Sequence, residues 1–343
     1  MVSVRVRVPV KVTLFGEHAV VYQKPAIAAT LPLYIRVEAR PLDREIITVE
    51  SRGINVPLRK AVYNRSSNIV SGEVDNDIVK RIVSYVIKAI EVCEEAVEAR
   101  LKGYSVTIES SLPVGVGLGT SAAISVGTVT ACLALNKVVT VLNNDVRKLI
   151  AYLAWQTEKR VQGAASPMDT HTVTFGGLLY VKPWIPSVEP IELKCKFPLI
   201  VGYTHKAYTT AELVSRVRNL YTKHSKVVEL ILDLIAVVVE EARKCIEECR
   251  LDELGELMNI NHGLLSALGV VSPQTDAIVH ALRRAGALGA KMSGAGGGGA
   301  FIALAKTEKD AEMLSSVVKG LGATVVAQSI HMGGVDIELE PMM

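Results

Sequence analysis

The feature that most constrains this chain is a run of alternate glycines. Residues 113–129 read PVGVGLGTSAAISVGTV, with Gly115, Gly117 and Gly119 just before an alanine-rich segment. Each glycine in regular structure costs roughly 1 kcal/mol relative to alanine, because it loses more backbone freedom on folding. Such a concentration of glycine indicates that another group, either a ligand or a neighbouring segment, lies close to the backbone here.

The segments on either side of this run indicate what that is. Alternating apolar residues predict a strand over 104–110, and the alanine-rich segment predicts a helix over 121–136. A glycine turn at a helix start presents unpaired N–H groups and the positive end of the helix dipole to a single point. The order therefore predicts an anion site, with phosphate as its usual ligand. The alternative is a turn whose glycines only permit tight packing.

The spacing excludes the two commonest phosphate-binding motifs. The run lacks the lysine of GxxxxGK[ST] and does not have the spacing of GxGxxG. Thr120 and Ser121 follow its last glycine, where a hydroxyl can reach a phosphate-bound Mg²⁺. Two more segments carry similar signals: PVKVTLFGEHAVVYQKPAIA at 9–28, and the glycine turn KMSGAGGGGAF at 291–301.

These segments, with PVGVGLGTSAA, resemble the three signature motifs of the GHMP kinase superfamily, in the family's order and across nearly the whole chain. The first motif most resembles that of the mevalonate kinases, because galactokinases continue with an acidic GEHTDY-like sequence and homoserine kinases lack the GEHAVVYxKPAIA run. The resemblance implies an amino-terminal α/β nucleotide-binding domain over 1–185 and a carboxy-terminal ferredoxin-like α+β domain over 186–343. The substrate would lie between them.

The resemblance also implies a reaction. It is transfer of the γ-phosphoryl group of ATP to the 5-hydroxyl of mevalonate, in line and without a covalent enzyme intermediate, as a step of isoprenoid synthesis. The residues that it assigns to the nucleotide belong to the second motif and to the stretch VDNDIVKRI, and they are Pro113, Gly115, Gly117, Leu118, Gly119, Thr120, Ser121, Ala122 and Asn76.

Phosphoryl transfer needs charge neutralisation, an in-line acceptor and a group that takes the acceptor's proton. By the same resemblance, Ser121 and Glu158 hold Mg²⁺, and Asp169 is the catalytic base beside Lys11. A nearby cation favours both an ionised base and an ionising hydroxyl. Taken alone, Glu158 could be part of a solvated helix face, Asp169 part of a turn, and Lys11 the exposed side of an edge strand. Val10 stands where the family usually has glycine, which could shift Lys11 slightly.

The acceptor is expected to meet four more residues. Glu17 and His18 belong to the first motif, with His18 as a donor to the substrate carboxylate and Glu17 as an orienting group. His18 could instead be a structural histidine. Thr209 and Thr210, in THKAYTTAEL, resemble the segment that closes over the acceptor. The glycines at 296–299 are expected to pack against the loop at 113–119.

Composition narrows the class of protein further. The chain has 343 residues and a net charge of +3, which does not indicate a nucleic-acid or membrane partner. It has no signal-peptide pattern and no uncharged apolar run of about 18 residues. The five cysteines include no CxxC pair, and Cys245 and Cys249 are expected on one helix face, so we expect reduced thiols in a cytoplasmic protein. We also expect a homodimer.

Two other functions stay open. A sister kinase that acts on phosphomevalonate, or on another hydroxyl of mevalonate, would favour extra Lys or Arg in the cleft. A non-catalytic sensor could keep the fold to bind a nucleotide and a sugar, but it would be expected to lose the base or the metal ligands. Asp169, Glu158 and Ser121 are all present.

Overall fold

The computed structural model describes residues 3–52, 60–72, 77–110, 112, 115–163 and 165–338. Two predicted nucleotide contacts, Asn76 and Pro113, lie outside the described residues. The helices are η1 (Ala19–Tyr22), α1 (Asp77–Val97), α2 (Thr120–Leu135), α3 (Asn144–Gln162), α4 (Met168–Phe175), α5 (Thr210–Lys223), α6 (Ser225–Glu247), α7 (Leu251–Ala267), α8 (Pro273–Arg284) and α9 (Glu308–Gly320). The strands are β1 (Val4–Phe15), β2 (Ala26–Leu42), β3 (Ile46–Arg52), β4 (Ala61–Asn64), β5 (Ile69–Gly72), β6 (Gly103–Ser110), β7 (Leu178–Lys182), β8 (Ser187–Pro190), β9 (Leu199–Tyr203), β10 (Gly289–Met292), β11 (Ala300–Leu304), β12 (Thr324–Ala327) and β13 (Asp336–Glu338).

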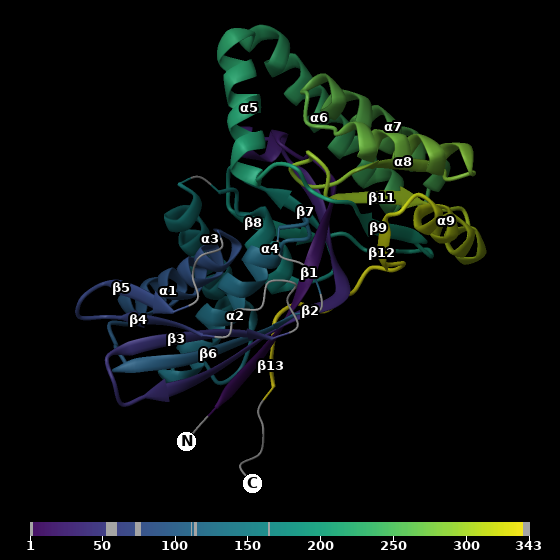
Figure 1. The fold of residues 1–343 in the computed structure, drawn as a ribbon. Helices are drawn as coiled ribbons and strands as arrows, with labels where there is room; N and C mark the ends of the chain where they lie inside the picture. Colours follow the sequence, from purple (N-terminus) through teal and green to yellow (C-terminus); the bar gives the residue numbers. More distant parts are fainter. Residues whose placement is uncertain are drawn as a thin grey trace.

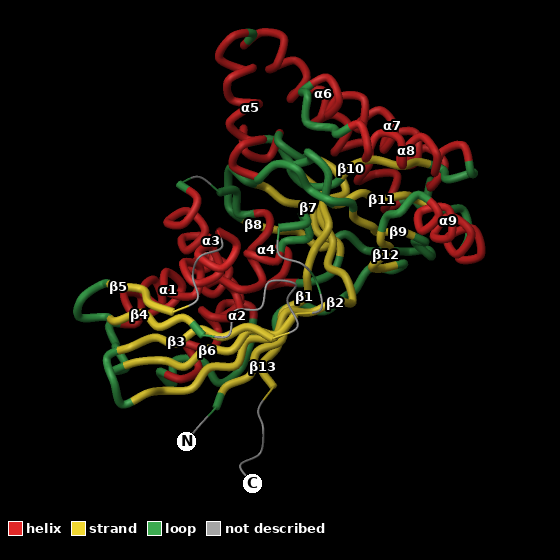
Figure 2. The backbone as a smooth tube through the Cα atoms, viewed as in Figure 1, coloured by secondary structure: helices red, strands yellow, loops and turns green. Residues whose placement is uncertain are grey.

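The larger sheet has the strand order β13-β1-β2-β6-β3-β4-β5, and β7 and β8 extend it from β2. β3 and β6 are parallel, whereas the other pairs are antiparallel. Figures 1 and 2 show α1, α2 and α3 together on one face of this sheet. α2 is apolar on all sides, as a central helix must be. At Gly127 it approaches β2 so closely that a Cβ would lie 2.6 Å from a methyl of Val37.

The smaller sheet has the order β10-β11-β9-β12, and its pairs are all antiparallel. α7 and α8 pack on β10, while α9 packs on β9 and β12 (Figure 1). An α/β part and an α+β part are therefore present, which confirms the expected fold class. Within the described ranges, every helix is too short or too polar to span a membrane.

The chain returns to the larger sheet after residue 185. β8 pairs with β7, and β13 pairs with β1 through Arg5 opposite Glu338 and Arg7 opposite Asp336. The domain boundary between 185 and 186 stays a prediction. These two pairings mean that some residues beyond that boundary build the first sheet.

One helix differs from the expectation. The segment 165–193 was expected to be loop, hairpin and connector, and β7 and β8 form the hairpin. Its first part is the helix α4, which starts after Pro167 and ends at Gly176. Threonines fill its turns, and Thr172 and Thr174 donate hydroxyl hydrogen bonds of 2.7 Å to carbonyls four residues earlier. A short threonine-rich helix has no apolar periodicity to reveal it.

The cysteine prediction was wrong. Cys93 on α1 is bonded to Cys132 on α2, and Cys195 is bonded to Cys249, while Cys245 is free and buried. Cys249 does not share a helix face with Cys245, because α6 ends at Glu247 and Cys249 has a φ of 58°. The bonded cysteines are 39 and 54 residues apart, so only the packing of separate elements brings them together. Reduced thiols therefore cannot support a cytoplasmic location.

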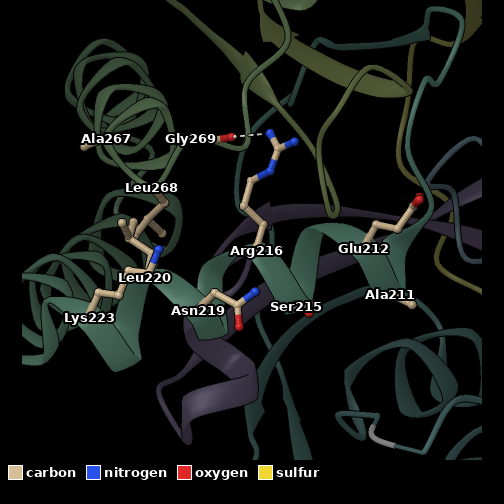
Figure 3. A pocket seen from close by; sticks show the side chains of 10 residues that line it. All are labelled: Ala211, Glu212, Ser215, Arg216, Asn219, Leu220, Lys223, Ala267, Leu268 and Gly269. Atoms are coloured by element: carbon tan, nitrogen blue, oxygen red, sulfur yellow. Dashed lines mark hydrogen bonds between the residues drawn. The ribbon is translucent and has the colours of Figure 1, made fainter.

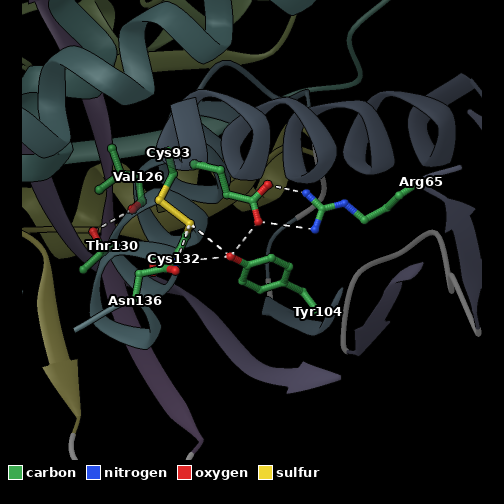
Figure 4. The surroundings of a disulfide bond; sticks show 8 residues. Arg65, Cys93, Tyr104, Val126, Thr130, Cys132 and Asn136 are labelled. Carbon is green, nitrogen blue, oxygen red and sulfur yellow. Dashed lines mark hydrogen bonds and ion pairs between the residues drawn. A yellow bond between two sulfur atoms is a disulfide. The ribbon is translucent and has the colours of Figure 1, made fainter. Parts of the chain in front are cut away.

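Polar side chains surround the first of these disulfides (Figure 4). The hydroxyl of Tyr104 donates to Glu94 at 3.1 Å, and the amide of Asn136 donates to that hydroxyl at 3.2 Å. Arg65 forms a buried ion pair with Glu94. The disulfide joins α1 to α2, and the hydrogen bonds of Tyr104 join both helices to β6 of the larger sheet.

Candidate active site

A cavity of about 340 Å³ brings the three motifs together. The end of β1, the glycine turn before α2 and the third-motif turn after β10 line it, together with residues of α1, α3, α4 and α5. A larger hollow of about 900 Å³ lies outside α5, beside the end of α7 (Figure 3). There Arg216 donates to the carbonyl of Gly269 at 3.3 Å, and the one carboxylate, Glu212, caps α5. The smaller cavity holds the acid–base groups and is the candidate site.

The glycine turn forms one wall of the cavity. Gly115, Gly117 and Gly119 have φ angles of 92°, 91° and 71°, which favour glycine. A Cβ at Gly115 would meet nothing within 4 Å, so the backbone there is open to a ligand. A Cβ at Gly119 would lie 2.8 Å from the Cγ of Lys11. The bare backbone thus serves two purposes: it leaves an open wall and it makes room for a lysine.

The turn leads directly into α2, whose first residues are Thr120 and Ser121. Both line the cavity with the three glycines. Leu118 and Ala122 are fully buried behind this wall, and the carbonyl of Leu118 accepts the backbone N–H of Lys11 at 3.0 Å. The three glycines, Thr120 and Ser121 therefore line the cavity as predicted. Leu118 and Ala122 do not reach it and pack behind its wall.

Lys11 and Asp169 meet at the cavity although they are far apart in the sequence. The ammonium of Lys11 lies 2.7 Å from Oδ1 of Asp169 and donates to the hydroxyl of Thr13 at 3.0 Å. The side chain of Lys11 is 3% exposed and that of Asp169 is 29% exposed. Val10 is buried in β1, with an irregular pairing to β2 between Pro9 and Lys11. The valine therefore does not move the lysine away from the carboxylate.

Glu158 lies on the other side of the glycine turn. The hydroxyl of Ser121 donates to Oε1 of Glu158 at 3.0 Å. Burial, and then the negative charge of Asp169, raise the pKa of Glu158 to about 8. A hydroxyl and a buried carboxylate are hard oxygen donors that suit Mg²⁺, and a cation would relieve the carboxylate's burial. Among the described residues no cluster of three or more His, Cys, Asp or Glu could hold a metal alone. This donor set fits an ion whose other ligands come from phosphates and water.

Glu17 is held by a residue that the sequence analysis did not identify. Lys291 of β10 forms a fully buried ion pair with one oxygen of Glu17 and also donates to the carbonyl of Met292 at 2.8 Å. Burial raises the pKa of Glu17 and lowers that of Lys291. The other oxygen of Glu17 has no hydrogen-bond partner among the described residues, although Glu17 lines the cavity. That oxygen can accept a hydrogen bond from a ligand hydroxyl.

His18 also lines the cavity, but its ring is engaged. Its Nε2 lies 2.9 Å from the carbonyl of Ala295, and burial lowers its pKa. A neutral ring that donates from Nε2 to a carbonyl has only an acceptor left at Nδ1. This chemistry suits a ligand hydroxyl better than the carboxylate expected from the sequence.

Thr209 and Thr210, which the sequence places together over the acceptor, have different roles in the structure. Thr209 is the N-cap of α5 and exchanges hydrogen bonds with Glu212 in a capping box. Thr210 lines the cavity, and its hydroxyl accepts a hydrogen bond from Lys206 at 3.1 Å. The structure therefore brings Thr210 to the site, while Thr209 shapes the helix beneath it.

Two cations beside the cavity were missed in the sequence. Arg81 of α1 lines the cavity. Lys206 lies close enough to the cavity to interact electrostatically with Lys11, Arg81 and Asp169. Burial, followed by the charges of Lys11 and Arg81, lowers the pKa of Lys206 to about 8. Neither cation has a carboxylate partner within 4 Å among the described residues. Arg81 lies in VDNDIVKRI and Lys206 in THKAYTTAEL, and no local sequence pattern distinguishes either from an ordinary surface cation.

The third-motif turn meets the glycine turn, as expected, but through fewer residues. A Cβ at Gly299 would lie 2.8 Å from the carbonyl of Val116. At Gly296 and Gly298 it would lie 2.1 Å from the carbonyls of Val270 and His205. A side chain at any of these positions would clash with backbone, yet only Gly299 of these packs on the glycine turn. The others pack on the second part of the molecule.

The fold and this site are those of a GHMP kinase, and the chain belongs to that family: the family descriptions GHMP kinases N terminal domain and GHMP kinases C terminal match residues 84–177 and 242–323. It is 38% identical to the mevalonate kinase of Thermococcus gammatolerans over 335 residues, which cover 96% of this chain and 97% of that protein. It is 39% identical to the mevalonate kinase of Pyrococcus horikoshii over 336 residues, covering 96% of each. The crystal structure of the Methanococcus jannaschii mevalonate kinase superposes with a TM-score of 0.72 at 29% identity, covering 96% of this chain and 98% of that one.

Proposed function

We propose that this chain catalyses the ATP-dependent phosphorylation of mevalonate on its 5-hydroxyl. The observation that carries the proposal is the ion pair of Lys11 and Asp169 in a cavity walled by the glycine turn. Relatives named mevalonate kinase are similar to this chain over nearly its full length. The product would be 5-phosphomevalonate.

The nucleotide would lie against the glycine turn and the start of α2. Backbone N–H groups and the positive end of the α2 dipole favour phosphate oxygens there. Ser121 and Glu158 would hold Mg²⁺, which neutralises the charge of the phosphates when bound. Tyr85 and Gln162 also line the cavity, and the hydroxyl of Tyr85 accepts a hydrogen bond of 2.7 Å from the amide of Gln162.

The chain's own residues supply the acid–base chemistry. Asp169 takes the proton of the acceptor hydroxyl at its carboxylate as the hydroxyl oxygen attacks the γ-phosphorus. Lys11 stabilises the ionised carboxylate before the transfer and the developing alkoxide during it. The buried position of Lys11 keeps water from screening its charge.

The acceptor would lie between the first motif and α5. The unpartnered oxygen of Glu17 and Nδ1 of His18 offer acceptors for its hydroxyls. Lys206 offers a cation for its carboxylate, held beside the cavity by Thr210. We propose Lys206, rather than His18, as the carboxylate-binding residue. We further propose that the chain works as a homodimer.

A coupled assay with ATP and Mg²⁺ that compares mevalonate with phosphomevalonate tests the substrate. Turnover of mevalonate alone is expected. Turnover of phosphomevalonate alone would identify a sister kinase, and no turnover with nucleotide binding intact would identify a sensor. Either of these results contradicts the proposal.

A further inference from the structure

A row of polar side chains leads away from Ser121 at the cavity wall. The amide of Gln162, the last residue of α3, donates to the hydroxyl of Tyr85 at 2.7 Å. That hydroxyl lies within hydrogen-bonding reach of Ser121, whose own hydroxyl donates to Oε1 of Glu158 at 3.0 Å. The four residues come from three helices, α1, α2 and α3, and all of them line the cavity. The row therefore connects the two candidate Mg²⁺ ligands to two residues without an assigned role.

The direction of each hydrogen bond in this row follows from the protons available. An amide N–H can only donate, so Tyr85 is the acceptor from Gln162. Tyr85 still has its single proton to donate, whereas Ser121 has already given its own proton to Glu158. The hydrogen bond between the two hydroxyls consequently runs from Tyr85 to Ser121. The donors therefore point in one direction, from Gln162 towards Glu158.

This arrangement leaves Ser121 with one free acceptor position. A serine hydroxyl has one proton and two lone pairs. Glu158 takes the proton and Tyr85 takes one lone pair, so the second lone pair is left for a cation. The hydroxyl cannot rotate without breaking one of its two hydrogen bonds. In the part of the chain that the structure describes, the hydrogen bonds to Glu158 all reach Oε1, so Oε2 is also left for a cation.

The packing of the helices holds Tyr85 in place. Tyr85 is only 3% exposed, and α1 packs against both α2 and α3. Cys93, about two turns after Tyr85 on α1, is bonded to Cys132 of α2. This disulfide restrains α1 from sliding along α2. The hydroxyl of Tyr85 is therefore kept at a fixed position relative to Ser121.

We propose that Tyr85 is a positioning residue for the metal ion: it orients the hydroxyl of Ser121 so that one lone pair faces Mg²⁺, and Gln162 holds the phenol in turn. Mg²⁺ demands near-ideal octahedral geometry, whereas Ca²⁺ accepts irregular sets of oxygen ligands. A fixed hydroxyl therefore favours Mg²⁺ over Ca²⁺. The inference rests on the proposed use of ATP and Mg²⁺, and it does not depend on mevalonate as the acceptor.

The test is calorimetric titration of the full-length chain with a non-hydrolysable ATP analogue, without metal, with Mg²⁺ and with Ca²⁺. The ratio of the dissociation constants without and with Mg²⁺ measures how strongly the ion supports binding, and it needs no turnover. Tyr85→Phe keeps the ring and removes the hydroxyl, so it should reduce this ratio about tenfold, as the loss of a group that orients a metal ligand does. It should also reduce the preference for Mg²⁺ over Ca²⁺.

Tyr104→Phe is the matched control. Tyr104 is also buried, and its hydroxyl also bonds to α1, through Glu94 at 3.1 Å, but Tyr104 does not line the cavity. Because each variant loses a buried hydrogen bond, both should unfold at a somewhat lower temperature. Tyr104→Phe should nevertheless leave the Mg²⁺ ratio and the preference over Ca²⁺ unchanged.

Gln162→Leu tests the first hydrogen bond of the row. It should reduce the Mg²⁺ ratio less than Tyr85→Phe, and the two substitutions together should add little to Tyr85→Phe alone, because Gln162 acts through Tyr85. Additive losses would overturn this part of the inference. An unchanged ratio in Tyr85→Phe, or an equal loss in Tyr104→Phe, would overturn the positioning role and leave the proposed function intact. A wild type in which Mg²⁺ does not strengthen binding of the analogue would overturn both the metal site and this role.

Discussion

Two buried lysines in this molecule hold carboxylates, and they do so in opposite ways. Lys291 and Glu17 are both fully enclosed, one on β10 and the other just after β1. Lys11 is equally enclosed, but Asp169 keeps 29% of its side chain exposed at the cavity. The first pair joins two parts of the chain that are 274 residues apart. The second pair leaves one partner free to meet a ligand.

The difference shows that burial of a charge does not by itself mark a catalytic group. An ion pair in which both charges are enclosed cannot exchange a proton with a reacting atom, so its charges act on folding, although the second oxygen of Glu17 remains an acceptor at the cavity wall. A pair with one open partner can exchange a proton with a ligand. Four sets of substitutions test this contrast and its extension to the rest of the site, from the largest expected effect to the smallest.

Asp169→Asn should have the largest effect. Because the amide cannot accept the proton of the acceptor, kcat should fall about 10²–10⁴-fold. ATP affinity should stay within a few-fold, since Asp169 is not part of the glycine wall. Steady-state kinetics with nucleotide titration measure both. An unchanged kcat would remove Asp169 as the base and with it the contrast between the two pairs.

Lys291→Met should lower the free energy of unfolding by about 3–5 kcal/mol, because it leaves Glu17 buried without its cation. Lys11→Met should cost only about 1 kcal/mol, since Asp169 can be hydrated from the cavity. Denaturant unfolding of the two variants compares them directly. Adding Glu17→Gln to Lys291→Met should regain part of the loss. Equal losses for both lysines would contradict the distinction between a sealed and an open pair.

Lys206, which has no carboxylate partner within 4 Å among the described residues, should make the binding of the acceptor depend on pH. Its pKa is lowered to about 8, so it is charged below that pH and loses its charge above it. We expect kcat/KM for mevalonate to fall up to tenfold per unit above pH 8. Lys206→Arg should keep the profile flat to higher pH, and Lys206→Met should raise KM for mevalonate below pH 8, where the wild-type lysine is charged. Lys223→Met, at the other end of α5, is the control. An unchanged KM for Lys206→Met would assign the carboxylate to another group.

Thr209 and Thr210 should separate an effect on stability from an effect on substrate binding, and both effects should be the smallest of the series. Thr209→Ala removes the cap of α5 and should cost about 1 kcal/mol of stability, with little change in kinetics of the folded enzyme. Thr210→Ala should leave stability nearly unchanged and raise KM for mevalonate, because Lys206 loses its hydrogen-bond partner. Thermal unfolding and KM together separate the two residues. The reverse pattern would show that the cap, rather than the cavity, controls the acceptor.

Much of the site could be predicted because its chemistry is concentrated in short segments. Gly115, Gly117 and Gly119 carry a backbone requirement that is visible in the sequence, and Ser121 follows from the helix start. Glu158 and Asp169 were identified by resemblance alone, because one acid in a helix and one near a proline have no distinctive local pattern.

What could not be predicted depends on packing between distant elements. Lys291 begins the third motif, but its pairing with Glu17 becomes visible only when the fold places β10 beside the end of β1. Cys93 and Cys132 are joined because α1 lies on α2, and their separation in sequence says nothing of this. α4 was missed because its threonines bond to their own helix rather than alternate with apolar residues.

The pairing of β13 with β1 also has a consequence for the synthesis of this protein. β1 carries Lys11, yet one of its edges is completed by residues 336–338, and Arg147 donates to the carbonyl of Val335 beside them at 3.0 Å. A chain still attached to the ribosome has made the whole nucleotide wall while that edge remains open, and open strand edges pair with other chains. β13 therefore closes this edge of the sheet, and a chain that stops before residue 336 is expected to aggregate more readily than one that includes β13.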